Sequence, residues 1–107
     1  MTIIANLEKL LGGPRDGALL RYSLGNEWLK AGDPAQAVEH LRAAVGRDPE
    51  YSAAWKLLGR ALTDSGQPQA ALAAYEHGVV AAQTRGDIQA AKEMAVFAKR
   101  LRQQTAG

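Results

Sequence analysis

The sequence predicts an all-α fold: a stack of helix–turn–helix repeats with one further helix at each end. The first observation behind this prediction is an internal repeat, because the chain of 107 residues matches itself at an offset of 34 residues. The residues that coincide include Leu24 with Leu58, Gly25 with Gly59, Gly32 with Gly66, and Ala37 with Ala71. The second observation is that apolar residues recur at helical spacings of three and four, while no stretch alternates cleanly as a strand would. The length corresponds to a single domain over residues 1–107.

The first element we expect is a short amphipathic helix over residues 2–11, in which Ile3, Leu7 and Leu10 share one side. Gly12-Gly13 would end this helix. We expect it to cap the first repeat, with dimerisation as the alternative. Binding to a lipid surface is less favoured, because the segment is short and carries a single lysine.

The two repeats, over residues 18–51 and 52–85, are each expected to form two helices. Gly32-Asp33-Pro34 separates the helices of the first repeat, and Gly66-Gln67-Pro68 separates those of the second. Glycine suits the left-handed position after a helix end, and proline suits the first turn of the next helix. Each of these two tripeptides therefore predicts a tight turn between antiparallel helices.

The last element we expect is a capping helix over residues 87–104, whose apolar arc would dock on the second repeat. The charge of the chain is uneven. Residues 85–107 carry 5 basic and 2 acidic side chains, whereas residues 1–84 carry 8 basic and 9 acidic ones. The whole basic excess therefore lies in this C-terminal segment.

The second repeat resembles the tetratricopeptide repeat, or TPR. Six of its residues stand at the family's signature positions: Trp55, Leu58, Gly59, Gly66, Ala71 and Tyr75. It departs from the family at Gly78 and Gln83, where Ala and Pro are usual, and in the first repeat Arg21 replaces the usual Trp. The resemblance implies a right-handed stack of helical hairpins, in which the signature residues serve packing.

The resemblance also implies a binding surface, because the first helix of each TPR lines a concave face that holds a peptide or a partner helix. The candidate residues from the first repeat are Tyr22, Asn26, Leu29 and Lys30. Those from the second repeat are Lys56, Arg60 and Thr63, and the C-terminal helix would add Lys92, Val96, Lys99 and Arg100. Such a groove would be basic and would suit an acidic peptide. The two-carboxylate clamp of some TPR domains is not supported, because Tyr22 and Leu57 replace its Lys and Asn.

Nothing in the sequence indicates catalysis, a cofactor or a metal site. His40, expected on an exposed helix face, and His77 are 37 residues apart with no acidic cluster beside them, and the chain has no cysteine. Phosphate-binding loops and nucleophile elbows are also missing from the sequence. We therefore expect a non-enzymatic module that binds a protein or peptide.

Two other functions stay open. One is weak nucleic-acid binding through Lys92, Lys99, Arg100 and Arg102, although the basic excess is slight. The other is a self-assembling structural unit, so we expect a monomer or a weak homodimer. No apolar run is long enough to cross a membrane, and Met1–Gly13 lacks the basic start of a signal peptide. A cytoplasmic protein is therefore expected.

Overall fold

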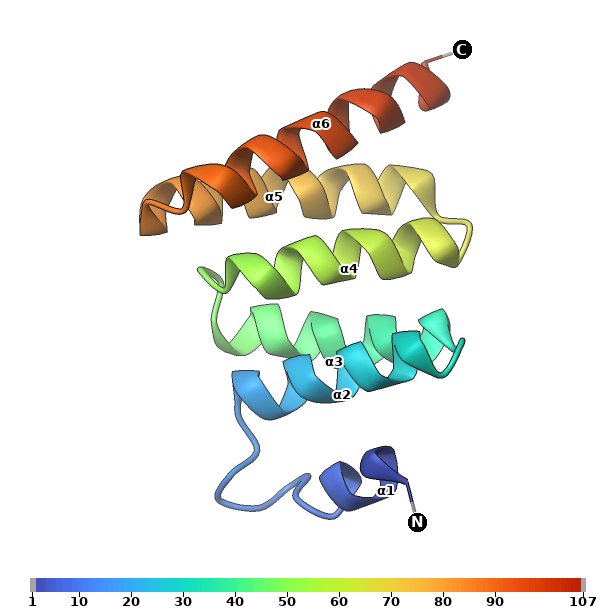
Figure 1. Cartoon of the computed structure of the whole chain (residues 1–107), viewed down its shortest axis with the longest axis vertical. Coiled ribbons are helices and arrows are strands. Elements are labelled where there is room, and N and C mark those ends of the chain that lie inside the picture. The colour runs from blue at the N-terminus through green and yellow to red at the C-terminus, as the bar shows by residue number, and fades with distance from the viewer. Residues whose placement is uncertain (1, 107) are drawn as a thin grey trace.

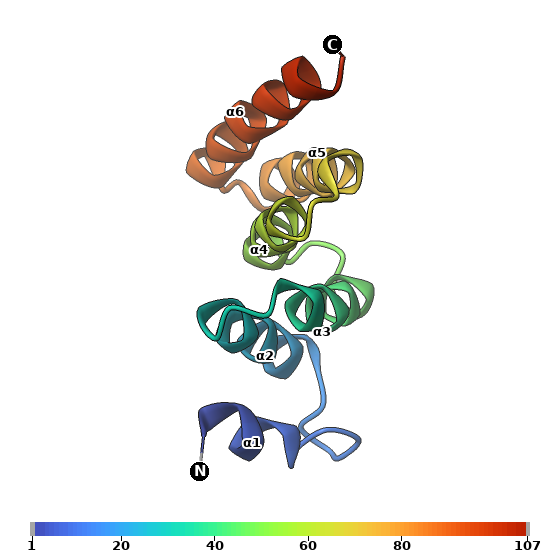
Figure 2. The same ribbon diagram turned by 90° about the vertical axis from the view of Figure 1, so that its right-hand side faces the viewer.

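The computed structural model describes residues 2–106, and these form six helices and no strand. The helices are α1 (Ile3–Glu8), α2 (Ala18–Lys30), α3 (Pro34–Arg47), α4 (Ser52–Asp64), α5 (Pro68–Arg85) and α6 (Ile88–Thr105). They follow one another in an elongated stack, with the two termini at opposite ends (Figure 1). Figure 2 shows α2, α4 and α6 on one side of the stack and α3 and α5 on the other. The predicted all-α fold is confirmed.

The turn between α2 and α3 and the turn between α4 and α5 share one geometry. Gly32 and Gly66 have φ values of 82° and 73°, in the left-handed region that favours glycine. The amide of the next residue then donates back to the preceding helix, from Asp33 N to Trp28 O at 3.0 Å and from Gln67 N to Leu62 O at 2.9 Å. The turn between α5 and α6 has the same form, so α6 takes the place of a third first helix.

The core of the stack is aliphatic and rich in alanine, and it runs from α2 to α6. Close approach of the helices depends on glycine at three positions, and at the first of them, Gly25, an added Cβ atom would clash with the side chain of Leu41. A Cβ atom at Gly59 would lie 2.5 Å from Cε1 and Cζ of Tyr75, and one at Gly78 would lie 2.3 Å from Sδ of Met94. These side chains fill space that a larger residue would need. Gly78 departs from the usual TPR alanine because Met94 of α6 packs against it.

The N-terminal helix is shorter than predicted. It ends at Glu8 instead of continuing to residue 11, and none of its residues is buried. Beyond Glu8 the chain forms turns, and the amide of Gly12 donates to Asp16 Oδ2 at 2.9 Å. Ile3 stays 59% exposed. Because so little of this helix is packed, the apolar spacing alone does not extend it over the predicted length.

Asp16 anchors the connector between α1 and α2. Arg21 donates to its carboxylate from Nε at 2.9 Å and from Nη2 at 3.0 Å. These bonds, together with the Gly12 amide, lower the pKa of Asp16 to about 2. Arg21, which stands where the family usually has tryptophan, thus forms an ion pair that holds the connector.

The other predicted boundaries differ little from the observed helices. The helix α6 covers residues 88–105, and Asp87 precedes it as its N-cap, accepting from Ala90 N at 3.2 Å. Trp55 is only partly buried, and its indole Nε1 donates to the carbonyl of Pro49 at 2.7 Å.

Candidate protein-binding groove

The face formed by α2, α4 and α6 contains a hollow of about 540 Å³, which we call the central hollow. Most of its lining comes from α4, with single residues from α2, α5 and α6. The lining residues are Tyr22, Ala53, Lys56, Leu57, Arg60, Tyr75 and Phe97. Four helices, α2, α4, α5 and α6, therefore contribute to one site.

The wall of the central hollow is aromatic. Tyr75 and Phe97 pack with ring centroids 5.3 Å apart, and Tyr22 packs on Tyr51 with centroids 5.0 Å apart. Tyr75 is buried, and that burial raises the pKa of its phenol. Both pairs lie in the range of favourable aromatic contacts, so the wall is a packed and mainly apolar surface.

The cations of the central hollow are paired with carboxylates. Lys56 Nζ lies 2.7 Å from Glu93 Oε1 of α6, and Arg60 Nε lies 3.7 Å from Asp64 Oδ2 on the same helix. The hydrogen bond from Lys56 lowers the pKa of Glu93, and the charge of Lys56 acts in the same direction. The central hollow is therefore close to electrically balanced, in contrast to the basic groove expected from the sequence.

Two smaller hollows continue the central one. One of about 250 Å³ lies between α1 and α2 and shares Tyr22 with it. The other, of about 170 Å³, is lined by residues of α4, α5 and α6 and shares Tyr75 and Phe97. We call these three hollows together the groove. It extends from α1 to the C-terminal half of α6.

Six of the residues predicted from the sequence line the groove: Tyr22, Asn26, Lys56, Arg60, Thr63 and Arg100. The structure places the others elsewhere. Leu29 packs against the core, and Lys30 is exposed and pairs with Glu27 at 3.3 Å.

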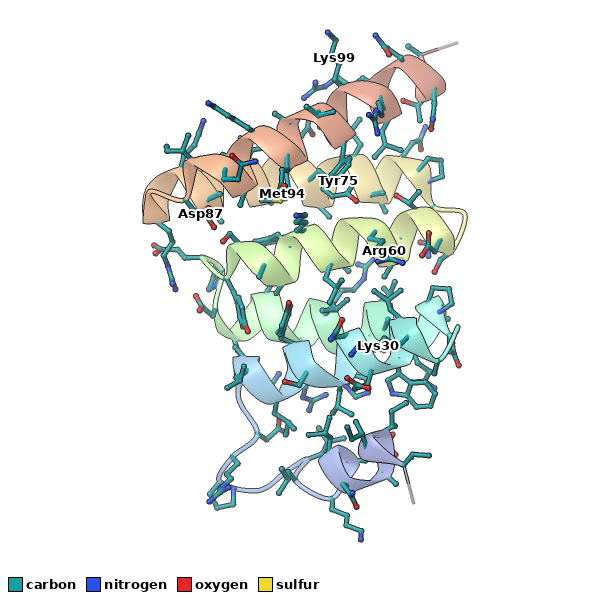
Figure 3. The ribbon with its side chains drawn as sticks, viewed as in Figure 1. Lys30, Arg60, Tyr75, Asp87, Met94 and Lys99 are labelled. Carbon is teal, nitrogen blue, oxygen red and sulfur yellow. The ribbon has the colours of Figure 1, made fainter. Side chains whose placement is uncertain are left out.

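The remaining three predicted residues, Lys92, Val96 and Lys99, are exposed on α6 and line none of the three hollows. Figure 3 shows Lys99 along the edge of α6 that faces away from α4, whereas Arg60 lies on α4. The reason is the orientation of α6, which buries Met94 and Ala98 and turns Phe97 toward the groove.

Sequence reasoning missed Ala53, Leu57, Tyr75 and Phe97 as groove residues. Tyr75 was expected only to serve packing, but its ring also forms part of the groove wall together with Phe97. Helical spacing offers a signal for Leu57, which follows Ala53 by four residues and precedes Arg60 by three, so these residues lie on one helical row. No comparable signal exists for Ala53, because a small apolar residue suits many positions.

The basic residues of α6 have different surroundings. Arg102 Nη2 lies 2.9 Å from Glu76 Oε2 on α5, and Arg100 lines the groove. Lys99 lies on the outer edge of the helix (Figure 3). Of the cations considered for nucleic-acid binding, Arg100 therefore faces the groove and Arg102 is paired with α5, whereas Lys99 lies on the outer edge.

A separate hollow of about 440 Å³ lies against α5 and shares no residue with the groove. Its lining includes Trp55, Ala73, Glu76 and Val80. His77 also lines it, and its imidazole stacks on the indole of Trp55 with centroids 4.9 Å apart and planes inclined by 14°. We call it the α5 hollow. It offers a second surface against which binding in the groove can be compared.

His40 is buried, with 8% of its surface exposed, and the prediction of an exposed helix face was wrong. Its position explains this, because it lies between the buried Ala37 and Ala44 on one helical row of α3. Burial, followed by the charge of Arg21, lowers the pKa of His40.

Residues 2–106 contain no group of three His, Cys, Asp or Glu side chains that could hold a metal ion. Across the same residues, no helix is both long enough and apolar enough to cross a membrane.

Comparison with known proteins identifies the family. The family model described as tetratricopeptide repeat matches residues 22–88. The TPR repeat-containing protein PA0015 of Pseudomonas aeruginosa is 50% identical over 99 residues, which cover 92% of this chain and 94% of that protein. The solution structure of protein BPP2914 from Bordetella parapertussis superposes with a TM-score of 0.81 at 42% identity, covering 99% of this chain and 92% of that one. None of these descriptions names a catalytic activity. The chain belongs to the tetratricopeptide repeat family.

Proposed function

We propose that this chain is a non-catalytic interaction module that binds a peptide or a helix of another protein in the groove. Proteins of this family generally mediate protein–protein interaction. The observation that carries the proposal is the row of three hollows along α1, α2, α4 and α6, which share lining residues and have an aromatic wall in the central one. A concave apolar surface bordered by a few polar groups suits recognition of a peptide.

The dimensions of the stack support an extended ligand. The molecule measures 43 Å along its longest axis. An extended segment rises about 3.3 Å per residue, so about 10 residues would follow most of the groove. A shorter helix could occupy the central hollow alone.

A non-catalytic role is supported by the ionisable groups of the described residues. The shifted pKa values of Asp16 and Glu93 each follow from an ion pair, with Arg21 and with Lys56. That of His40 follows mainly from its burial in the stack. These groups lie in separate contacts and do not combine with a nucleophile, as the groups of an active site would.

Two matched variants test the proposal. Ala53 and Ala73 are both exposed helical alanines, but Ala53 lines the central hollow and Ala73 lines the α5 hollow. We expect Ala53→Trp to fill the central hollow and to weaken binding of a partner by at least about tenfold, equivalent to about 1.4 kcal/mol. Ala73→Trp should leave the affinity unchanged. The measurement is calorimetric titration with a partner captured from native cell extract by the unmodified chain and then purified.

Thermal unfolding of both variants provides the control for folding, since neither substitution removes a buried group. Loss of binding only in Ala73→Trp would place the contact on the α5 side and overturn the proposal. Equal loss in both variants at unchanged stability would also contradict a site confined to the groove.

A further inference from the structure

The central hollow combines an apolar pocket with an ammonium group. Leu57, Tyr75 and Phe97 line it together with Lys56, and Lys56 immediately precedes Leu57 on α4. A ligand side chain that fills the apolar part of the hollow therefore brings its neighbouring residues close to Lys56. The charge state of those neighbours then affects binding.

Lys56 already holds a carboxylate from its own chain. Its Nζ lies 2.7 Å from Glu93 Oε1, and the pair joins α4 to α6, which both line the central hollow. The two side chains are 40% and 41% exposed, so solvent reaches both groups. Exposed ion pairs contribute little to stability, because water screens them and ordering two long side chains costs entropy. One carboxylate can therefore replace another on Lys56 without disturbing the fold.

Arg60 offers a comparison within the same hollow. Its partner Asp64 lies four residues further along α4, and the Nε–Oδ2 distance is 3.7 Å. This second pair is looser and stays within one helix. The Lys56–Glu93 pair is the closer of the two contacts, and it connects two helices of the groove.

We propose, on the basis of the function proposed above, that the central hollow binds an apolar side chain of a partner segment while a nearby carboxylate of that segment replaces Glu93 on Lys56. Glu93 is then an internal competitor that selects for partners carrying an acidic residue beside the apolar one. In an extended segment, residues rise about 3.3 Å each and alternate in direction, so this acidic residue lies within about two positions of the apolar anchor.

The proposal makes opposite predictions for the two members of the ion pair. The probes are two fluorescein-labelled peptides of about 12 residues, rich in Ser and Gly, long enough to follow the groove in extended form. Both carry a central leucine, flanked on each side by glutamate in the acidic peptide and by glutamine in the neutral one. Fluorescence polarisation measures their affinity for the full chain and its variants.

We expect the full chain to bind the acidic peptide more tightly than the neutral one. Glu93→Gln should tighten binding of the acidic peptide by about two- to fivefold, the range for exposed charge pairs, and leave the neutral peptide unchanged. Lys56→Gln should remove the difference between the two peptides. Asp64→Asn is the matched control, since it removes the negative charge paired with Arg60 of the same hollow but leaves the Lys56–Glu93 pair in place.

Unchanged or weaker binding of the acidic peptide by Glu93→Gln would overturn the proposal. An equal gain from Asp64→Asn would also overturn it, because general electrostatics would then suffice. If both peptides bind and Ala53→Trp abolishes binding, but Glu93→Gln has no effect, the proposed function stands and the competition by Glu93 is wrong. Binding of neither peptide would also reject the competition, and the captured partner then tests the proposed function separately.

Discussion

Gly59 and Gly46 are both helical glycines, but their surroundings give them different roles. A Cβ atom at Gly59 would meet the Tyr75 ring at 2.5 Å, whereas one at Gly46 would have no atom of another element within 4 Å. The TPR signature predicts a packing role for Gly59, and the structure adds that the ring held there also forms part of the groove wall. Gly46 lies on the exposed side of α3, where the residue type is not constrained by packing.

We therefore expect the same substitution to have opposite effects at the two positions. Gly59→Ala should destabilise the fold, because overpacking costs about 1–3 kcal/mol and the better helix propensity of alanine recovers at most about 1 kcal/mol. Gly46→Ala should stabilise the fold by about 0.5–1 kcal/mol. Denaturant unfolding of both variants measures the difference. A stabilising effect at both positions would show that the Tyr75 ring moves aside without cost.

At the scale of helices, the two ends of the stack differ in how firmly they are packed. The helix α6 buries four residues, Ala91, Met94, Ala98 and Leu101, whereas α1 buries none. The sequence predicted α6 to within one residue at each end, because its apolar arc is a local signal. It overestimated α1, since the course of the chain after Glu8 depends on a contact between Gly12 and Asp16 that no periodicity reveals.

Removing either end should therefore have unequal consequences. A chain ending at Gly86 loses the cover over Gly78 and Tyr75, so we expect aggregation or loss of a cooperative unfolding transition. A chain lacking residues 1–9 keeps the Gly12–Asp16 bond and should stay folded, with a melting temperature lowered by only a few degrees. Thermal unfolding and light scattering measure both outcomes. The role of α6 as a cap is wrong if the chain ending at Gly86 stays monomeric and melts like the parent.

For the whole molecule, the contacts explain which features the sequence could predict. Helices contact their neighbours along the chain, with α2–α4 and α4–α6 as the additional contacts among residues 2–106. Helical hairpins of this kind follow from local turn and spacing signals, so their order was predictable. The groove arises where α2, α4 and α6 meet, and its closest ion pair joins Lys56 to Glu93, 37 residues later. Such a pairing depends on the rotation of each helix in the stack, which the sequence pattern leaves open.

This linear arrangement predicts a gradient of local stability along the stack. The central helix α4 contacts α3 and α5 as well as α2 and α6, whereas α1 contacts α2 alone among the described helices. Local opening costs least where few apolar groups are buried. We therefore expect the free energy of opening, measured by amide exchange, to be at least about 2 kcal/mol lower in α1 than in α4. Native-state hydrogen exchange, followed by nuclear magnetic resonance, measures this difference. Equal protection in α1 and α4 would show that the stack opens only as one unit, and the nearest-neighbour description of its stability would then be wrong.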